Sequence, residues 1–162
     1  MQWPVLPDYG CFPRWPVDGD AFIHPDDVAI ATKCFPSERV LRRYRFDDVY
    51  YHYSYGKIRF RLMPCMWLKV EPDGIDIGDE VETVGVGMER ELFVGVVWGM
   101  HYVRRKGRIL YRLRRGDNVI PRLYSADHLR LLTVKETVRP GEIGHPEPKW
   151  SGQGETISDL DL

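Results

Sequence analysis

The chain has 162 residues, enough for one medium domain or two very small ones. Hydrophobic residues make up 43% of it and charged residues 29%, and its 15 glycines and 12 prolines favour short elements joined by turns over long helices. The net charge of -1 excludes a polycation that coats nucleic acid along its whole length.

The first 24 residues are rich in proline and in large apolar side chains. Prolines restrict the backbone, and Trp3, Phe12, Trp15 and Phe22 are large anchors for packing. We expect residues 1–24 to form an extended arm that packs across the rest of the molecule. Its tryptophans are expected to close an apolar interface between the parts that follow.

Residues 25–72 contain a clear strand pattern. Ile58, Phe60 and Leu62 alternate with basic residues, which is the period of a strand with one apolar and one charged face. Gly56 precedes this strand, where a hairpin turn often requires positive φ. The segment 38–46 is ambiguous, because Ser37 is a good helix cap, but we interpret it as a strand by comparison with residues 89–97.

Residues 75–135 repeat the pattern. Ile109, Tyr111 and Leu113 alternate with basic residues after Gly107, and the turn signal at 116–118 predicts that 108–115 also pairs with 119–124. A short turn at Ser125 then precedes a last strand at 128–132. Residues 137–162 are polar and rich in proline and glycine, and we expect a flexible tail.

The two parts align with each other. ERVLRRYRFDDVYYHYSYGKIRFRL (38–62) lies without a gap over ERELFVGVVWGMHYVRRKGRILYRL (89–113), with eight of 25 positions identical. PDDVAIAT (25–32) also resembles IGDEVETV (77–84), and PCMWLKV (64–70) resembles SADHLRL (125–131). This order predicts an internal duplication, with RRGDNVIPRL inserted in the second copy.

Each copy resembles the small SH3-like barrel of Tudor and related domains. The second copy carries the pattern best, with Gly78-Asp79-Glu80-Val81, then a bent hairpin, then a short turn before the last strand. The resemblance implies a mainly β protein with two tandem SH3-like barrels, at about 25–72 and 75–135. Each barrel is small for independent stability, so we expect the pair to share an apolar interface. Trp67 and Trp98 are expected to lie in the core or the interface. Because this fold serves many functions, it implies architecture more than activity.

The stretch YYHYSYGKIRFRL raises a first binding hypothesis. Tudor-like barrels often hold methylated lysine or arginine in an aromatic cage, and the resemblance makes Tyr50, Tyr53, Tyr55 and Trp67 the candidates for a peptide site. The alternative is that these tyrosines only form the wall of a strand, since alternate side chains point to opposite faces.

A second hypothesis rests on basic residues around one hairpin. They could follow a phosphate backbone, with tyrosines nearby for stacking, or they could be a solvated strand face that pairs with the acids of 71–91. The candidates are Arg104, Arg105, Lys106, Arg108, Arg112, Arg114 and Arg115.

Catalytic and metal motifs are not recognisable. The histidines lie outside any ligand spacing, the adjacent acids at 26–27 and 47–48 are typical of turn caps, and His24, Asp27 and Cys34 could converge only by folding. The cysteines at 11, 34 and 65 show no paired spacing, so a disulfide framework or a zinc site is not expected.

We therefore expect a non-catalytic binding module without a cofactor that recognises an anionic partner, nucleic acid, through the basic hairpin. The first alternative is a protein-protein interaction module that binds a peptide at the tyrosine-rich surface or in the groove between the barrels, and the second is an enzyme with a scattered site. No signal peptide and no membrane-spanning run is recognisable, so a cytoplasmic protein is expected.

Overall fold

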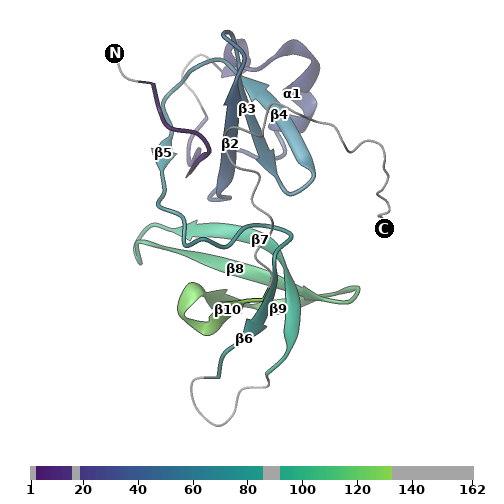
Figure 1. Ribbon diagram of the computed structural model, residues 1–162. Helices are drawn as coiled ribbons and strands as arrows, with labels where there is room; N and C mark the ends of the chain where they lie inside the picture. Colours follow the sequence, from purple (N-terminus) through teal and green to yellow (C-terminus); the bar gives the residue numbers. More distant parts are fainter. Residues whose placement is uncertain (1–2, 16–18, 86–91, 133–162) are drawn as a thin grey trace.

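A computed structural model describes residues 3–15, 19–85 and 92–132 of the chain. Within these residues the protein forms two five-stranded antiparallel sheets, one above the other in Figure 1. The prediction of a mainly β protein is confirmed. The predicted tail at 137–162 lies outside the described residues.

The first sheet has the strand order β4-β3-β2-β1-β5. Its strands are β1 (Asp8–Cys11), β2 (Leu41–Phe46), β3 (Tyr51–Tyr55), β4 (Ile58–Leu62) and β5 (Leu68–Lys69). Strand β1 comes from the segment that was predicted to be an arm, and it is hydrogen-bonded to β2 on one side and to β5 on the other. The ambiguous segment before Asp47 is a strand from Leu41 onward.

A helical connection separates β1 from β2. It contains the 3-10 helices Gly19–Phe22 and Pro25–Asp27 and the helix α1 (Val28–Ala31). The predicted match of PDDVAIAT with IGDEVETV is therefore not a structural one, because the first segment is helical and the second contains β6 (Glu80–Thr83). Pro25 suits the first helical position, and the ring nitrogen of His24 accepts a hydrogen bond from the Asp26 amide, so this segment starts a helix. No helix in the described ranges has the length and apolar character needed to cross a membrane.

The second sheet has the strand order β10-β6-β7-β8-β9. Its strands are β6 (Glu80–Thr83), β7 (Val94–Val103), β8 (Arg108–Arg115), β9 (Asn118–Ser125) and β10 (Leu129–Leu131). The 3-10 helix Ala126–His128 precedes the last strand, as the sequence predicts. The end strands do not pair in either sheet, so the sheets are not closed barrels.

The two sheets share their strand order and a local irregularity. In each, the strand that comes last along the chain pairs with the first, and the others follow in chain order. The pairing of the second and third strands shifts between Arg43 and Arg45 in one sheet and between Val97 and Gly99 in the other. Asp8 is paired with Arg43, and Asp79 accepts a backbone hydrogen bond from Val97, so a buried aspartate occupies the same place in both sheets.

This correspondence differs from the sequence alignment. The gapless match of 38–62 with 89–113 places β4, the fourth strand of its sheet, over β8, the third strand of the other. Matching by strand order instead pairs β3 with β8 and Gly56 with Gly116, both of which have φ of 62°. The residues RRGDNVIPRL are then part of the β8–β9 hairpin and are no insertion. The duplication itself stays a prediction.

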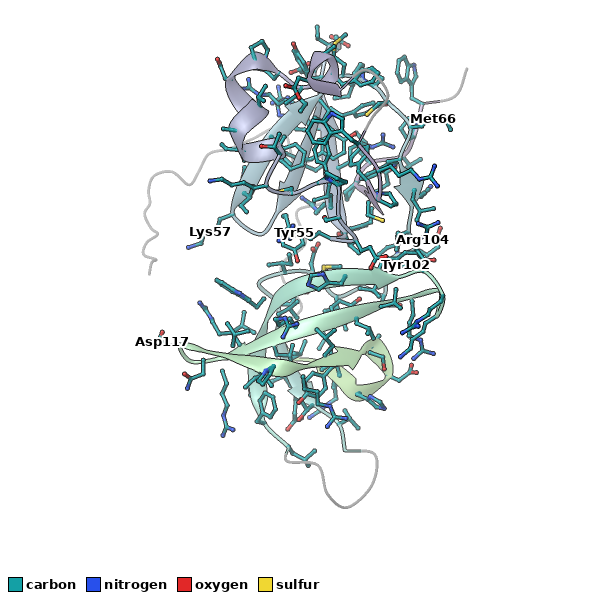
Figure 2. All side chains as sticks on the ribbon, turned by 180° about the vertical axis from the view of Figure 1, so that it is seen from behind. Tyr55, Lys57, Met66, Tyr102, Arg104 and Asp117 are labelled. Atoms are coloured by element: carbon teal, nitrogen blue, oxygen red, sulfur yellow. The ribbon has the colours of Figure 1, made fainter. Side chains whose placement is uncertain are left out.

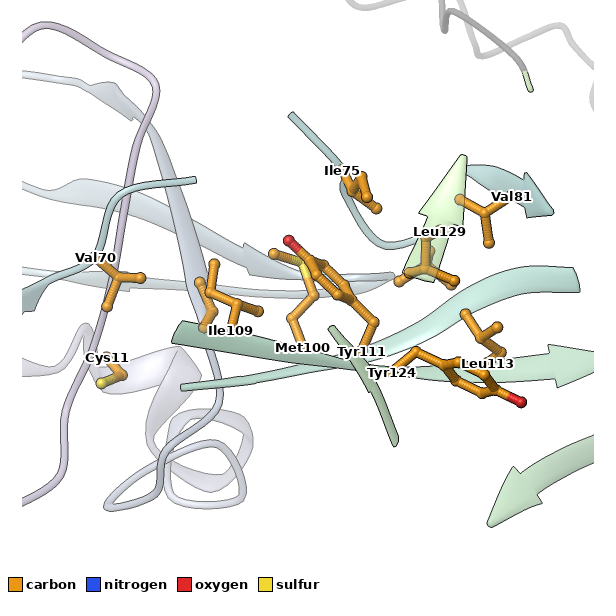
Figure 3. Close-up of a cluster of buried hydrophobic side chains, with 12 residues drawn as sticks. Cys11, Val70, Ile75, Val81, Met100, Ile109, Tyr111, Leu113, Tyr124 and Leu129 are labelled. Atoms are coloured by element: carbon orange, nitrogen blue, oxygen red, sulfur yellow. The ribbon is translucent and has the colours of Figure 1, made fainter. Parts of the chain in front are cut away.

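The sheets share one part of the core. Cys11 and Val70 of the first part of the chain are buried in the same cluster as Met100 and Ile109 (Figure 3). Residues 38–40 pair with the second half of β7, since the Val40 amide donates to the Met100 carbonyl at 2.9 Å. The predicted apolar interface is therefore present.

The N-terminal tryptophans do not close this interface. Trp3 stacks on Phe46 and Trp15 stacks on Phe35, so both pack against the first sheet and its helical connection. Trp98 is 48% exposed and is not part of the shared cluster, so its predicted place in the core or the interface is wrong. It lies at the irregular position of β7, under the guanidinium of Arg114.

Candidate binding groove

An open groove of about 580 Å³ lies beside the first sheet. We call it the aromatic groove. Arg14 and Arg104 contribute the positive charge at its wall, and the other lining residues are mostly apolar. They include Phe12, Trp15, Phe22, Met66, Trp67 and Leu68.

Trp67 is fixed by close contacts with the first sheet. A Cβ atom at Gly10 would lie 2.7 Å from a carbon of the indole, so only glycine leaves room for the ring at this point of β1. The ring centroids of Phe12 and Tyr53 lie 5.6 Å and 5.4 Å from that of Trp67. The side chain of Trp67 is thus held in place by the core of the first sheet.

A buried ion pair lies against Trp67. The guanidinium of Arg43 is 4.6 Å from the Trp67 ring centroid and 4.4 Å from that of Tyr51. Its Nε and Nη2 atoms donate to the two carboxylate oxygens of Asp8 at 2.8 Å and 2.6 Å. Because a guanidinium binds aromatic faces and carboxylates in fixed geometry, this pair orients the indole.

The groove contains one thiol. Burial raises the pKa of Cys65 to about 11, because the surroundings disfavour the thiolate. The thiol is therefore protonated near neutral pH and adds apolar surface to the groove. It has no character of a nucleophile there.

The positive side of the groove comes from the turn between β7 and β8. Gly107 has a φ of 63°, and its amide donates hydrogen bonds to the carbonyls of Val103 and Arg104, which complete this turn. Figure 2 shows Arg104 at one end of the second sheet, below Met66, with Asp117 at the opposite end. We call the exposed basic side chains of this turn and of the first residue of β8 the basic turn, and they are Arg104, Arg105, Lys106 and Arg108.

The structure divides the predicted basic residues into two sets. The basic turn holds four of the seven candidates, and Arg112, Arg114 and Arg115 lie further along β8. Arg112 donates to the carbonyls of Ile120 and Pro121 at 3.2 Å and 3.0 Å, and Arg114 and Arg115 cover the rings of Trp98 and Phe93. The side chains of these three arginines are thus engaged within the second sheet.

The predicted tyrosine candidates do not face a common space. Tyr53 is fully buried and stacks on Phe60, and the hydroxyl of Tyr55 accepts a hydrogen bond from the Met100 amide between the sheets. The Tyr50 ring lies 4.9 Å from that of His24. Of the four predicted peptide-binding residues, Trp67 alone is in the aromatic groove.

Other groove residues come from the predicted arm and were not proposed as a site. Phe12, Trp15 and Phe22 were expected only as packing anchors, and Arg14 was not singled out. The high aromatic content of this segment was the feature of the sequence that could have indicated a binding site. These residues come close to Trp67 because β1 pairs with β5. Local sequence patterns do not predict this pairing.

The side chains of His24, Asp27 and Cys34 have different partners. Asp27 accepts hydrogen bonds from the guanidinium of Arg61 at 2.8 Å and 3.1 Å, and Cys34 is buried in the core of the first sheet. Asp47 instead accepts from the amides of Val49 and Tyr50, as expected of a turn cap. No group of three or more metal-ligating side chains is found among the residues described.

Comparisons with known proteins give one result. No curated protein and no solved structure matches the chain. One family model, described as a family of unknown function (DUF6960), matches residues 1–130. That range holds the whole first sheet, every residue of the aromatic groove and the basic turn. The chain therefore belongs to the DUF6960 family.

Proposed function

We propose that the protein is a non-catalytic binding module that recognises nucleic acid, with the basic turn on the phosphate backbone. The observation that carries this proposal is the exposed cluster of four basic side chains, one of which also lines the aromatic groove. Lysine and arginine contacts with phosphates supply most of the affinity of such complexes, and aromatic surfaces add base stacking.

The charge of the basic turn is available to a ligand. Arg108 lies 3.7 Å from Asp127, and both side chains are at least half exposed, so this ion pair is weak in water. An incoming phosphate would compete with Asp127 for Arg108 at little cost. The nearly neutral net charge of the whole chain makes recognition local to this end of the second sheet.

The arrangement of strands supports the interpretation as two SH3-like units. Both sheets have the same strand order, and both have the irregularity between the second and third strands. Small β folds of this class commonly serve as recognition modules, so the architecture agrees with binding and does not choose the ligand.

Binding of fluorescein-labelled oligonucleotides, measured by anisotropy, tests this function. Affinity is expected to fall steeply between about 50 mM and about 200 mM salt, because phosphate contacts release counterions. R104E/R105E is expected to reduce affinity at least about tenfold and to lower the salt dependence. The matched control is K57E/R122E, which makes the same change in charge at two exposed residues outside the basic turn and the groove. Absence of binding at low salt, or equal loss in the control, contradicts the proposal.

A peptide is the second candidate ligand. Met66 is 95% exposed beside an apolar groove, and exposed methionine is common on surfaces that bind peptides. A peptide replaces nucleic acid as the proposed ligand if the R104E/R105E variant still binds a peptide partner and the W67A variant does not.

A further inference from the structure

We propose, on the basis of the proposed function, that the aromatic groove receives unstacked bases, so that the nucleic-acid partner is single-stranded. The sugar-phosphate backbone of the strand would follow Arg14 and Arg104 while a base enters between the rings. This inference names the class of nucleic acid, which the basic turn alone leaves open.

The groove has the size and the lining that a base requires. Its volume of about 580 Å³ lies in the range of small-ligand sites, and its walls are mainly rings and other apolar side chains. Every base has an aromatic face, so stacking on tryptophan and phenylalanine is favourable without a hydrogen-bond code. In a duplex those faces are covered by neighbouring base pairs, and only an open strand can offer them.

The rings are held in place before a ligand arrives. Trp67 packs between β1 and the guanidinium of Arg43, and Phe12 and Trp15 both contact Phe35 with centroid distances of 5.0 Å and 5.1 Å. A fixed platform loses little conformational entropy on binding, which favours affinity for a flexible strand.

Phosphate contacts are available from both parts of the molecule. Arg14 belongs to the segment after β1, and Arg104 belongs to the turn after β7, so the groove has a cation from each of two distant segments at its wall. Arg105 and Lys106 continue the positive surface away from the groove. A strand whose base occupies the groove would therefore have a basic path for its neighbouring phosphates.

The groove is not a requirement of this type of sheet. In the second sheet the pair Thr83 and Leu129 stands where Phe12 and Trp67 lie in the first. The second sheet packs without aromatic rings at these two positions. Phe12 is buried in the core of the first sheet, and Trp67 packs against it at the groove, so these rings are a difference between two similar sheets.

The test compares three labelled ligands on the wild-type protein: a single strand, the duplex of the same sequence, and a single strand of abasic sites. The intact single strand is expected to bind at least about tenfold more tightly than the other two, since stacking contributes about 1–3 kcal/mol per base. W67A and F22A are expected to lose this preference. W98A is the matched control, because Trp98 is an exposed tryptophan outside the groove.

The outcomes separate this inference from the proposed function. Equal binding of duplex and single strand, sensitive to R104E/R105E and insensitive to W67A and F22A, overturns the inference and leaves the proposed function standing. Absence of binding to all three ligands at low salt overturns both. If circular dichroism shows that W67A is unfolded, F22A and the abasic comparison on the wild type decide the result.

Discussion

The buried guanidinium of Arg43 has no counterpart in the second sheet, where Val97 occupies the same position. Asp8 and Arg43 are both buried, whereas the matching aspartate of the second sheet, Asp79, accepts a hydrogen bond from the backbone amide of Asp76. A buried ion pair costs desolvation and is not needed for stability alone. The contact of Arg43 with Trp67 explains the ion pair, because Arg43 holds the indole at the wall of the aromatic groove.

Breaking this ion pair on one side is expected to be costly. R43M leaves the Asp8 carboxylate buried without its partner, so the free energy of unfolding should fall by about 3–5 kcal/mol in urea titrations. The double variant D8V/R43M should lose less than R43M. The control R45M removes an exposed arginine of the same strand and should change stability by no more than about 0.5 kcal/mol. A double variant no more stable than R43M would contradict this account.

Single residues show how far the sequence predicts the site. Trp67 and Arg104 were among the candidates because their types suit stacking and phosphate binding, but they belonged to two separate hypotheses. The structure brings them to one groove. Tyr53 was a candidate for the same chemical reason and is fully buried, since strand alternation turns it toward the core.

Among the elements, the strands with strong alternation were predictable. β4 and β8 have apolar residues at every second position, and Gly56 and Gly107 mark their turns. β1 was not predicted because its four residues, DYGC, show no alternation of apolar and polar side chains and lie between prolines. Its place between β2 and β5 depends on contacts with distant residues, which a local pattern does not contain.

The sequence alignment of the two halves matched the wrong strands, β4 with β8, for a related reason. Basic and apolar residues alternate in more than one strand of each sheet, so a hairpin of one sheet resembles the neighbouring hairpin of the other. The length of the connections also differs, since residues 12–40 contain helices and the second sheet has only residues 84–93 between its first two strands. The correct match of strands follows from the pairing of the strands in the structure, which the sequence does not show.

The turn that carries Asp27 is joined to β4, and this contact is expected to depend on pH. The hydrogen bond from the Arg61 guanidinium lowers the pKa of Asp27, against the smaller opposing effect of burial. A lowered pKa stabilises the fold above the ordinary value of about 4, and the stabilisation is lost as pH falls through the pKa of the folded protein. D27N is expected to reduce the free energy of unfolding by about 1.5–3 kcal/mol at neutral pH.

The difference between wild type and D27N should shrink when the urea titration is repeated in acid. In acid the Asp27 carboxyl of the wild type is protonated and uncharged, as the amide of D27N is at every pH, so the stabilities of the two proteins become similar. D117N is a suitable control, because Asp117 is exposed in the β8–β9 turn. A difference that stays constant from neutral pH to below about 3 would show that the charge of Asp27 is not what matters.

At the scale of the whole molecule, the sheets are joined by backbone, side chains and core. Residues 38–40 pair with β7, and Tyr55 reaches Met100. The connection between the sheets is also fixed, because Tyr111 donates to Asp73 at 2.9 Å and Tyr9 donates to Asp76 at 2.6 Å. The small size of the two units predicted a common interface, and Tyr9 and Cys11 of the segment that was expected to be an arm contribute to it.

Destabilising this interface is expected to affect both sheets together. V40A removes apolar volume from the shared cluster and should cost about 1 kcal/mol or more, because a cavity remains. Hydrogen exchange followed by mass spectrometry should show faster exchange of peptides from β2–β4 and from β7–β8. V49A is the control, since Val49 is 51% exposed. Acceleration confined to one sheet would mean that the two unfold independently.

Strand β7 changes its partner along its length, from β6 at its start to residues 38–40 near its end. Deleting the first sheet would remove the second partner and leave the Met100 carbonyl and the Tyr102 amide without their present hydrogen bonds. An opened strand edge is a template for pairing with other chains, so the isolated second sheet would be prone to aggregation. Proteolytic fragments and domain truncations of this protein are therefore poor substitutes for the intact chain in any search for its ligand.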